Sequence, residues 1–461
     1  MHFNFIWAVI CASVGSGFQH GYNTGVVNPP HEVIAEWIRR SPHTGVSSED
    51  GVVLLWSAAV AIFCIGGMIG GGLVGVFANK MGRKGGLIFN NFFALVAALM
   101  MFSAKPCNTV YLLIAGRFVI GLNCGLNAGL APMYLSEISP TKIRGAVGSM
   151  YQLMITISIM IAQLLGLQSV LGSENIWHYL FLLTGVPAII QLVGFLFAPE
   201  SPKYYLEEKQ NEDKATKALH KLNGDEDISN QFQEIKSDIE SSKATSNVTI
   251  KDLFMESKLR KPLMILCFLM VAQQLSGINA VMFYSTHIFK MGNLSEESSQ
   301  YSTLGVGIVN VLVTIVSVYL VEFFGRKTLL LVGFAGMFVS TLLLFIGLYF
   351  VVSYNWAGYA CIGFVYIYVI FFASGAGSIP WLIGPELFNT ACRPAALSLA
   401  VPTNWLFNFF VGIAFLPIQE HIGAAVFIIF IICQVLSLIV IWMFVPETKN
   451  KPIEEITALF Q

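Results

Sequence analysis

The sequence contains twelve long apolar runs, each about as long as a helix that crosses a lipid bilayer. A spanning helix needs about 20 predominantly apolar residues. The chain is 55% hydrophobic and only 11% charged, which is too apolar for a soluble globule of this length. The runs lie approximately at 6–27, 53–77, 86–103, 109–133, 148–168, 180–198, 263–285, 303–322, 329–351, 357–381, 396–416 and 423–445. The pattern predicts an all-α membrane protein with twelve transmembrane helices.

A polar segment, residues 199–262, separates the sixth run from the seventh and is too polar to span. Its Ile228, Phe232, Ile235 and Ile239 fall on one face of an amphipathic helix, so short surface helices are expected there. The predicted organisation is therefore an N-terminal six-helix bundle, a linker, a C-terminal six-helix bundle and a tail, at 1–198, 199–262, 263–445 and 446–461.

Three short motifs recur in the second half of the chain at an offset of about half its length. Gly82-Arg83-Lys84 recurs as Gly325-Arg326-Lys327, and Glu137 with Arg144 recurs as Glu386 with Arg393. Pro199-Glu200-Ser201 recurs as Pro446-Glu447-Thr448. Such an offset indicates a duplicated six-helix unit, and transporters are commonly built in this way.

Lys and Arg gather in the loops on the side of the two termini. By the positive-inside rule, both termini and the central segment are expected in the cytoplasm. The repeated charged residues lie at the cytoplasmic ends of the predicted spans, where they could anchor the topology or lock the two halves as charge pairs while the inner side is shut. Because acidic residues contribute little to topology, the repetition of Glu favours the lock, made by Arg83, Glu137, Arg144, Glu200, Arg326, Glu386, Arg393 and Glu447.

Polar side chains recur at helical spacing inside six of the predicted spans. A polar group left unpaired in lipid costs several kcal/mol, so these stripes must face other helices or water. One stripe alone would suggest hydrogen bonding between helices, whereas so many together favour a shared water-filled cavity. The stripes are Ser16, Gln19, His20 and Asn23; Asn123 and Asn127; Gln152, Thr156 and Gln163; Asn310, Thr314 and Ser317; Ser374 and Ser378; and Asn404 and Asn408.

The seventh run adds Gln273, Gln274 and Asn279 within an otherwise apolar stretch. Gln273 and Asn279 would lie about 120° apart on a straight helix, so both reach one ligand only if the helix unwinds at Ser276-Gly277. Amides donate and accept hydrogen bonds as hydroxyl groups do. Aromatic residues that could pack on a sugar ring lie in this run and in later runs: Phe283, Tyr284, Phe372, Trp381 and Trp405. The cavity therefore suits a neutral polyol, bound weakly at about millimolar affinity.

The sequence offers no pattern for catalysis or for a cofactor. It has no nucleotide-binding P-loop, no GxSxG and no HExxH. The eight cysteines are scattered, without a CxxC pair or metal-ligand spacing, and the net charge of −1 does not suggest a nucleic-acid partner. We therefore expect neither an enzyme nor a cofactor-binding protein.

Several motifs in combination resemble the facilitative glucose transporter family, the sugar porters of the major facilitator superfamily, and its class I in particular. They are GYNTGVVN at 21–28, GRFVIGLNCGL at 116–126, PMYLSEISPTKIRG at 132–145, PESPKYYL at 199–206, QQLSGINA at 273–280, GIVN at 307–310, IPW at 379–381, TNW at 403–405 and VPETK at 445–449. The resemblance covers nearly the whole chain. It implies two six-helix bundles that rock around a central site and carry a hexose across the plasma membrane.

The same resemblance implies a set of sugar-binding residues: Gln152, Gln273, Gln274, Asn279, Asn310, Trp381 and Asn404. Gln274-Leu275-Ser276 matches the motif linked to a preference for glucose over fructose. Asn293-Leu294-Ser295 is the externally placed glycosylation sequon. The choice among glucose, galactose, mannose, fructose and dehydroascorbate stays open at the level of sequence, as does the oligomeric state.

The chain departs from the family pattern in the tenth span, which reads FFASGAGSIPW. Ala373 stands where the family usually has an acid, and Ala376 and Ser378 stand where it has prolines. Fewer prolines predict a less kinked helix. His20 stands where an aromatic residue is typical.

Two questions of mechanism follow from the resemblance. Proton-coupled relatives tend to carry a carboxylate in the first span, where this chain has Asn23, which favours a uniporter. The alternatives are a proton-linked symporter that uses His20, since histidine titrates near neutral pH, and a transporter-like sugar sensor. The short tail after Val445 argues against the sensor.

Overall fold

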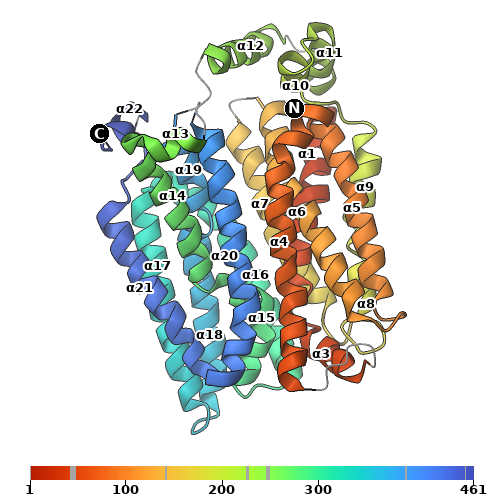
Figure 1. Ribbon diagram of the computed structural model, residues 1–461, viewed down its shortest axis with the longest axis vertical. Helices are drawn as coiled ribbons and strands as arrows, with labels where there is room; N and C mark the ends of the chain where they lie inside the picture. The colour runs from red at the N-terminus through yellow and green to blue at the C-terminus, as the bar shows by residue number, and fades with distance from the viewer. Residues whose placement is uncertain are drawn as a thin grey trace. The chain divides into compact units, whose positions relative to one another are not determined.

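The computed structural model describes residues 2–41, 48–140, 143–224, 228–244, 250–389, 392–451 and 453–460. Every regular element in these ranges is helical, as Figure 1 shows, so the all-α prediction is confirmed.

The helices follow the apolar runs closely. The first half contains α1 (Phe3–Ala12), a π-helical segment (Ser13–Gly17), α2 (Phe18–Gly25), α3 (His31–Arg40), α4 (Glu49–Met81), α5 (Arg83–Ser103), α6 (Val110–Ile138), α7 (Arg144–Leu165), α8 (His178–Leu182) and α9 (Gly185–Phe195). The second half contains α14 (Ser257–Leu275), α15 (Ile278–Met291), α16 (Glu296–Phe323), α17 (Arg326–Phe350), α18 (Trp356–Phe371), a π-helical segment (Phe372–Ala376), α19 (Ile379–Leu387), α20 (Arg393–Ile422), α21 (Val426–Phe444) and α22 (Ile453–Ala458).

Among the described residues, 10 helical stretches are long and apolar enough to cross a membrane. They account for eleven of the predicted runs, because α20 and α21 form one stretch, Arg393–Phe444, that covers the last two runs. The first run lies on α1, the π-helical segment and α2, and it is not among these 10 stretches.

The central segment forms short helices, as its amphipathic pattern predicts. They are α10 (Pro202–Glu207), α11 (Glu212–Asn223), α12 (Ser229–Ala244) and α13 (Ile250–Met255), and Figure 1 shows them beyond the ends of the long helices. Ile228 and Ile239 are buried and Phe232 and Ile235 are half-buried, which confirms the predicted apolar face.

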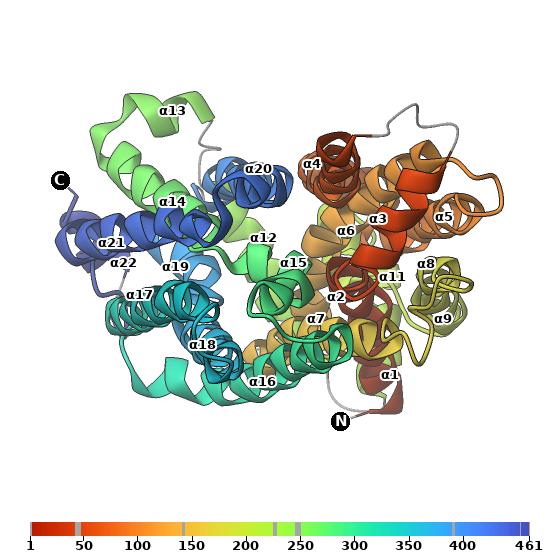
Figure 2. The same cartoon turned by 90° about the horizontal axis from the view of Figure 1, so that it is seen from below.

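The chain divides into two compact units. The first comprises Met1–Thr24, Ile62–Ala162 and His178–Ser246, and the second comprises Gly25–Ala61, Gln163–Trp177 and Asn247–Gln461. Within the first unit α5 packs against α6 and α9; within the second, α17 packs against α18 and α21, and α14 against α20, as Figure 2 shows. The predicted boundaries after residues 198 and 262 stay a prediction, since residues 25–61 and 163–177 group with the C-terminal helices.

The seventh run is broken where the sequence predicts it. Helix α14 ends at Leu275 and α15 begins at Ile278, and Gly277 between them has a φ of +99°, in the left-handed region that favours glycine. A Cβ atom on Gly277 would also lie 3.0 Å from the ring of Phe430. The break is therefore fixed by a position that only glycine occupies without strain.

Gly277→Ala is expected to lower the free energy of unfolding by roughly 1–2 kcal/mol, because an L-residue is strained in the left-handed region. Gly363 is the matched control: it lies inside α18, and a Cβ atom there meets nothing within 4 Å. Thermal unfolding of the purified protein measures both variants. Equal midpoints for Gly277→Ala and Gly363→Ala would contradict this explanation of the break.

The tenth span is interrupted even though it lacks prolines at 376 and 378. A kink smaller than that of the family stays a prediction. Helix α18 ends at Phe371, a π-helical segment covers Phe372–Ala376, and α19 begins only at Ile379. Gln273 Nε2 donates to the carbonyl oxygens of Ala376 (2.7 Å) and Gly377 (3.0 Å). The interruption therefore persists without proline at 376 and 378, because a side chain of α14 satisfies carbonyl groups at this point.

Candidate functional site

Four amide side chains meet inside the second unit, and we call them the amide cluster: Gln273, Gln274, Asn279 and Asn404. They come from the end of α14, the start of α15 and the middle of α20. Gln274 Nε2 donates to Asn404 Oδ1 at 3.0 Å, and Asn404 Nδ2 donates to Gln273 Oε1 at 2.8 Å. Asn279 Nδ2 donates to Gln274 Oε1. The structure brings these four predicted residues together, and their role in lining a sugar site stays a prediction.

The break at Gly277 is what brings the cluster together. It redirects the chain between Gln274 and Asn279, so the two side chains bond directly. All four amides are buried, between 4% and 8% exposed. Asn404 also donates to the carbonyl oxygen of Met270 at 3.2 Å. The cluster is thus a buried, uncharged patch whose donors and acceptors are partly paired with one another.

The hydrogen bonds among the four amides limit the affinity that the amide cluster could have for a ligand. A hydroxyl-rich ligand would exchange amide–amide hydrogen bonds for amide–hydroxyl bonds, since each amide can donate and accept. The net gain of such an exchange is at most about 1 kcal/mol per bond. The geometry therefore supports weak binding of a neutral polyol, and it leaves the presence of water beside the cluster a prediction.

The other predicted binding residues lie apart from the cluster's hydrogen bonds. Asn310 on α16 is 6% exposed, and its carbonyl oxygen accepts a bond from Thr314 in the same helix. Trp381 on α19 is 41% exposed, and Gln152 on α7 is an exposed residue of the first unit. Within the described part of the chain, no hydrogen bond joins these three residues to the cluster. Their role in binding stays a prediction.

The polar stripe of the fourth span pairs with a neighbouring helix and not with a cavity. Asn90 Nδ2, on α5, donates to the carbonyl oxygen of Asn123 (2.9 Å) and to Asn127 Oδ1 (3.0 Å). Asn127 Nδ2 in turn donates to Asn123 Oδ1 at 3.0 Å. The cavity interpretation is wrong for this stripe. Asn90 was not predicted as a partner from the sequence, because Asn90 and Asn91 are adjacent and form no stripe at helical spacing.

Two residues of the polar stripe in the first span form hydrogen bonds with a neighbouring helix segment. Ser16 Oγ accepts a bond from Gln191 Nε2 at 2.8 Å, and Asn23 Oδ1 accepts one from Thr184 Oγ1 at 3.1 Å. The buried amides of Gln19 and Gln163, by contrast, have no hydrogen-bond partner among the described residues. These two amide groups therefore have donors and acceptors that a buried polar ligand could bind.

In the first unit, the repeated charged motif forms a buried ion pair. Arg83 Nε lies 2.9 Å from Glu137 Oε2, with side chains 6% and 10% exposed. Glu200 accepts hydrogen bonds from the backbone N–H groups of Lys84 (3.0 Å) and Gly85 (3.2 Å) at the N-terminus of α5, where a carboxylate is favoured. Burial raises the pKa of Glu200, while these backbone bonds oppose the rise.

The second unit repeats this arrangement. Arg326 Nη2 lies 2.8 Å from Glu386 Oε1. Glu447 accepts bonds from the backbone N–H groups of Arg326 (2.7 Å) and Lys327 (3.1 Å) at the start of α17. Each of these ion pairs joins residues of the same unit. A role in locking the halves against each other stays a prediction.

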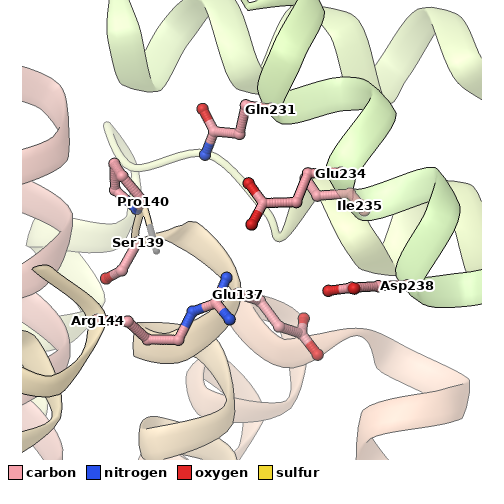
Figure 3. Close-up of a pocket in the computed structure, with 8 residues that line it drawn as sticks. All are labelled: Glu137, Ser139, Pro140, Arg144, Gln231, Glu234, Ile235 and Asp238. Atoms are coloured by element: carbon pink, nitrogen blue, oxygen red, sulfur yellow. The ribbon is translucent and has the colours of Figure 1, made fainter. Parts of the chain in front are cut away.

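Arg144 and Arg393 complete the repeated set. Arg144 is exposed and lines a small hollow with Glu137, Glu234 and Asp238, and Figure 3 shows its guanidinium group pointing toward these acidic side chains. Arg393 Nη2 donates to the carbonyl oxygen of Phe388 at 3.4 Å. Helix α12 of the central segment supplies two of the carboxylates around Arg144.

Comparison with known proteins gives the family of this chain. The family model described as "Sugar (and other) transporter" matches residues 8–460, so the chain belongs to this family. It is 42% identical over 463 residues to the facilitated glucose transporter member 3 of solute carrier family 2 from Ovis aries, covering 99% of this chain and 92% of the relative. It is 43% identical over 453 residues to the facilitated glucose transporter protein 1 of Caenorhabditis elegans, covering 97% and 89%.

Solved structures agree on the fold. The xylose transporter XylE from E. coli in a partially occluded inward-open conformation matches with a TM-score of 0.82 and 25% identity, covering 98% of this chain and 100% of that one. The proton:xylose symporter XylE bound to 6-bromo-6-deoxy-D-glucose matches with a TM-score of 0.77 and 27% identity, covering 99% of each chain. The protein is therefore a multi-pass membrane protein with the twelve-helix fold of the major facilitator superfamily.

Proposed function

We propose that this protein is a facilitative transporter that moves a hexose, D-glucose above all, down its gradient by alternating access. The observation that carries the proposal is the amide cluster, an uncharged group of four buried amides at a broken membrane helix. Its chemistry suits sugar hydroxyl groups, and the relatives named above are glucose transporters. Gln274-Leu275-Ser276, at the break, supports glucose over fructose by family resemblance.

The proposed sugar site extends the amide cluster by Gln152, Asn310 and Trp381. Asn310 supplies a buried amide and Trp381 an exposed indole face. The unpartnered amides of Gln19 and Gln163 are further candidates for contact with a polar ligand. The repeated charged residues are proposed to act at the cytoplasmic side, as pairs that favour one of the two access states.

Uniport is favoured by the surroundings of Asn23. The fully buried Arg117 donates from Nη1 to the carbonyl oxygen of Asn23 at 2.7 Å, and its guanidinium group lies 4.6 Å from the ring centroid of Phe63. Proton-coupled members of the family tend to carry a carboxylate at the position of Asn23. An amide cannot exchange a proton there, so uptake is expected to be indifferent to a proton gradient.

Asn23→Asp is expected to make glucose uptake sensitive to pH. The new carboxylate would lie in a buried site near Arg117, where its charge would depend on proton exchange with one side of the membrane. Initial uptake rates into liposomes, with and without an inward proton gradient, measure the effect. Wild-type protein serves as the reference. If the proton gradient left the uptake rate of the variant unchanged, as it does for the wild type, this role for position 23 would be contradicted.

His20 supports the second candidate, a proton-linked symporter. Its Nδ1 lies 3.5 Å from the hydroxyl oxygen of Tyr151, and a proton:xylose symporter is among the solved structures of similar fold. The deciding experiment is uptake of labelled glucose by the purified protein in liposomes. Uniport predicts saturable entry that the proton gradient leaves unchanged. Acceleration by an inward gradient, lost in His20→Phe, would establish the symporter instead.

The proposed setting is the plasma membrane, with both termini in the cytoplasm and Asn293 outside. Asn293 is exposed in the turn between α15 and α16, which suits a glycosylated position. Glycosidase treatment of the protein made in animal cells should increase its electrophoretic mobility, and Asn293→Gln should remove that increase. The same mobility before and after treatment of the wild type would argue against glycosylation.

A further inference from the structure

Two histidines and a glutamate converge in the second unit, at the start of α3 and near the end of α15. One ligand atom from each of His31, Glu32 and His287 lies within 4.8 Å of the other two. His31 and Glu32 open α3, whereas His287 lies in the last turns of α15. The sugar site uses none of these residues.

Side-chain bonds hold the two segments together at this point. Asn28 Nδ2 donates to the carbonyl oxygen of Met282 and to Ser285 Oγ, each at 2.7 Å. Asn28 Oδ1 accepts a bond from the backbone N–H of Thr286 at 3.1 Å. The ring of His31 stacks on that of Trp56, with centroids 5.4 Å apart and planes 9° apart. The approach of the two histidines is therefore fixed by surrounding structure.

Both histidines carry a ring nitrogen that is buried without a hydrogen bond. His31 is 6% exposed, and its Nδ1 has no hydrogen-bond partner among the described residues. His287 Nε2 lies 2.7 Å from Gln419 Oε1 and donates to it, which leaves the lone pair on Nδ1. That Nδ1 lies 3.8 Å from Glu32 Oε1, too far for a hydrogen bond. An oxygen acceptor behind the imidazole is the usual support of a metal-binding histidine.

We propose that His31, Glu32 and His287 form a zinc-binding site. Two imidazoles and one carboxylate are an established ligand set for zinc, with water in the fourth position. A tetrahedral site with bonds of about 2.1 Å separates its ligand atoms by about 3.4 Å, so the side chains must close by about 1.4 Å or less. Glu32 is 41% exposed at its side chain, which gives an ion and its water molecule access.

The ammonium group of Lys290 would compete with zinc for the carboxylate of Glu32. Its Nζ lies 3.2 Å from Glu32 Oε1 and 2.7 Å from Glu296 Oε2. A zinc ion would displace the ammonium group of Lys290 toward Glu296. Removing the Lys290 charge should then strengthen zinc binding.

The position of the site has a consequence for transport, which rests on the proposed function. Helix α3 lies in the first half of the chain and α15 in the second half, and both belong to the second compact unit. An ion bound to both helices would resist movement of α3 relative to α15, and we expect such movement to be part of alternating access. Zinc is therefore expected to slow glucose uptake from the side on which α3 lies.

Titration of the full-length protein in lipid nanodiscs with ZnCl₂, followed by calorimetry, tests the site directly. We expect one zinc ion per chain, with Mg²⁺ unable to compete. His31→Phe, which keeps an aromatic ring against its neighbour, and His287→Gln should each weaken binding at least 10-fold, and Gln419→Leu by about 10-fold or more. Lys290→Met should tighten binding. His421→Ala, an exposed histidine outside the cluster, is the matched control and should bind as the wild type does.

The possible results distinguish the zinc site from the proposed effect of zinc on transport. No zinc binding by the wild type below 1 mM, or equal affinity in His31→Phe and His287→Gln, would overturn the site. Lys290→Met guards against variants that lose binding by unfolding, because unfolding cannot tighten binding. Uptake is then measured with and without zinc. Binding without inhibition would overturn the consequence for transport alone, whereas no uptake even without zinc would count against the proposed function and leave the binding result standing.

Discussion

Gln274→Leu is expected to reduce the initial rate of glucose uptake at subsaturating sugar by about 30-fold. Gln274 donates to Asn404 and accepts from Asn279, so it is the central member of the amide cluster. Leucine removes both bonding groups, so Asn404 Oδ1 and Asn279 Nδ2 lose these partners, at about 1–3 kcal/mol for each buried group left unsatisfied. Two hydrogen bonds lost to the sugar, at about 1 kcal/mol each, account for a loss of about 30-fold. Asn279→Leu should act in the same direction.

Asn127→Leu separates a loss of sugar contacts from general damage. Asn127 also accepts one bond and donates another within a buried amide network, but this network joins α5 to α6 in the first unit. Its loss should therefore lower stability similarly while the apparent sugar affinity of the folded protein is kept. Uptake over a range of glucose concentrations measures both variants. Equal losses of apparent affinity in Gln274→Leu and Asn127→Leu would show that the amide cluster has no special part in binding.

Arg83→Met is expected to lower the free energy of unfolding by about 3–5 kcal/mol, the cost of leaving one partner of a buried ion pair alone. Glu137 is only 10% exposed at its side chain and would lose the guanidinium group that compensates its charge. Arg326→Met should cost less, because Arg326 and Glu386 are 18% and 27% exposed. Chemical unfolding of the purified protein in detergent measures both. Arg83→Met should be the more destabilising of the two variants because its ion pair is the more buried.

Lys236→Met is the control for this prediction. Lys236 forms an ion pair with Glu212 at 2.9 Å, with side chains 43% and 61% exposed. Exposed pairs of this kind contribute little to stability because water screens them. If Arg83→Met were no more destabilising than Lys236→Met, the buried pair could not be a stabilising part of the motif. A gain in uptake with unchanged stability would instead support a lock that holds one access state.

Features that are local in the chain could be predicted from the sequence. The Ser276-Gly277 break follows from two amides that a straight helix would turn apart, and the repeated charged motifs follow from simple comparison of the two halves. In both cases the residues that define the feature are close together in the chain. The structure then supplies the distances between them.

Features that depend on distant partners could not be predicted. Asn90 pairs with the stripe of the fourth span, yet the spacing of Asn123 and Asn127 alone cannot distinguish a partner helix from a cavity. The interrupted tenth span depends on Gln273, a side chain of the seventh span. His31 and His287 lie more than half the chain apart, and only the packing of α3 on α15 brings them together. Periodicity describes one helix and carries no information about its neighbours.

Uptake by the purified protein in sealed liposomes, with labelled D-glucose, L-glucose and D-fructose and without any ion gradient, tests the central claim most directly. Glucose uniport predicts saturable D-glucose entry, little entry of L-glucose, and slower entry of fructose. Entry that requires an imposed ion gradient would contradict uniport, and fructose entry faster than glucose would contradict the proposed specificity. Absence of carrier-dependent entry for all three sugars would contradict the proposed function itself.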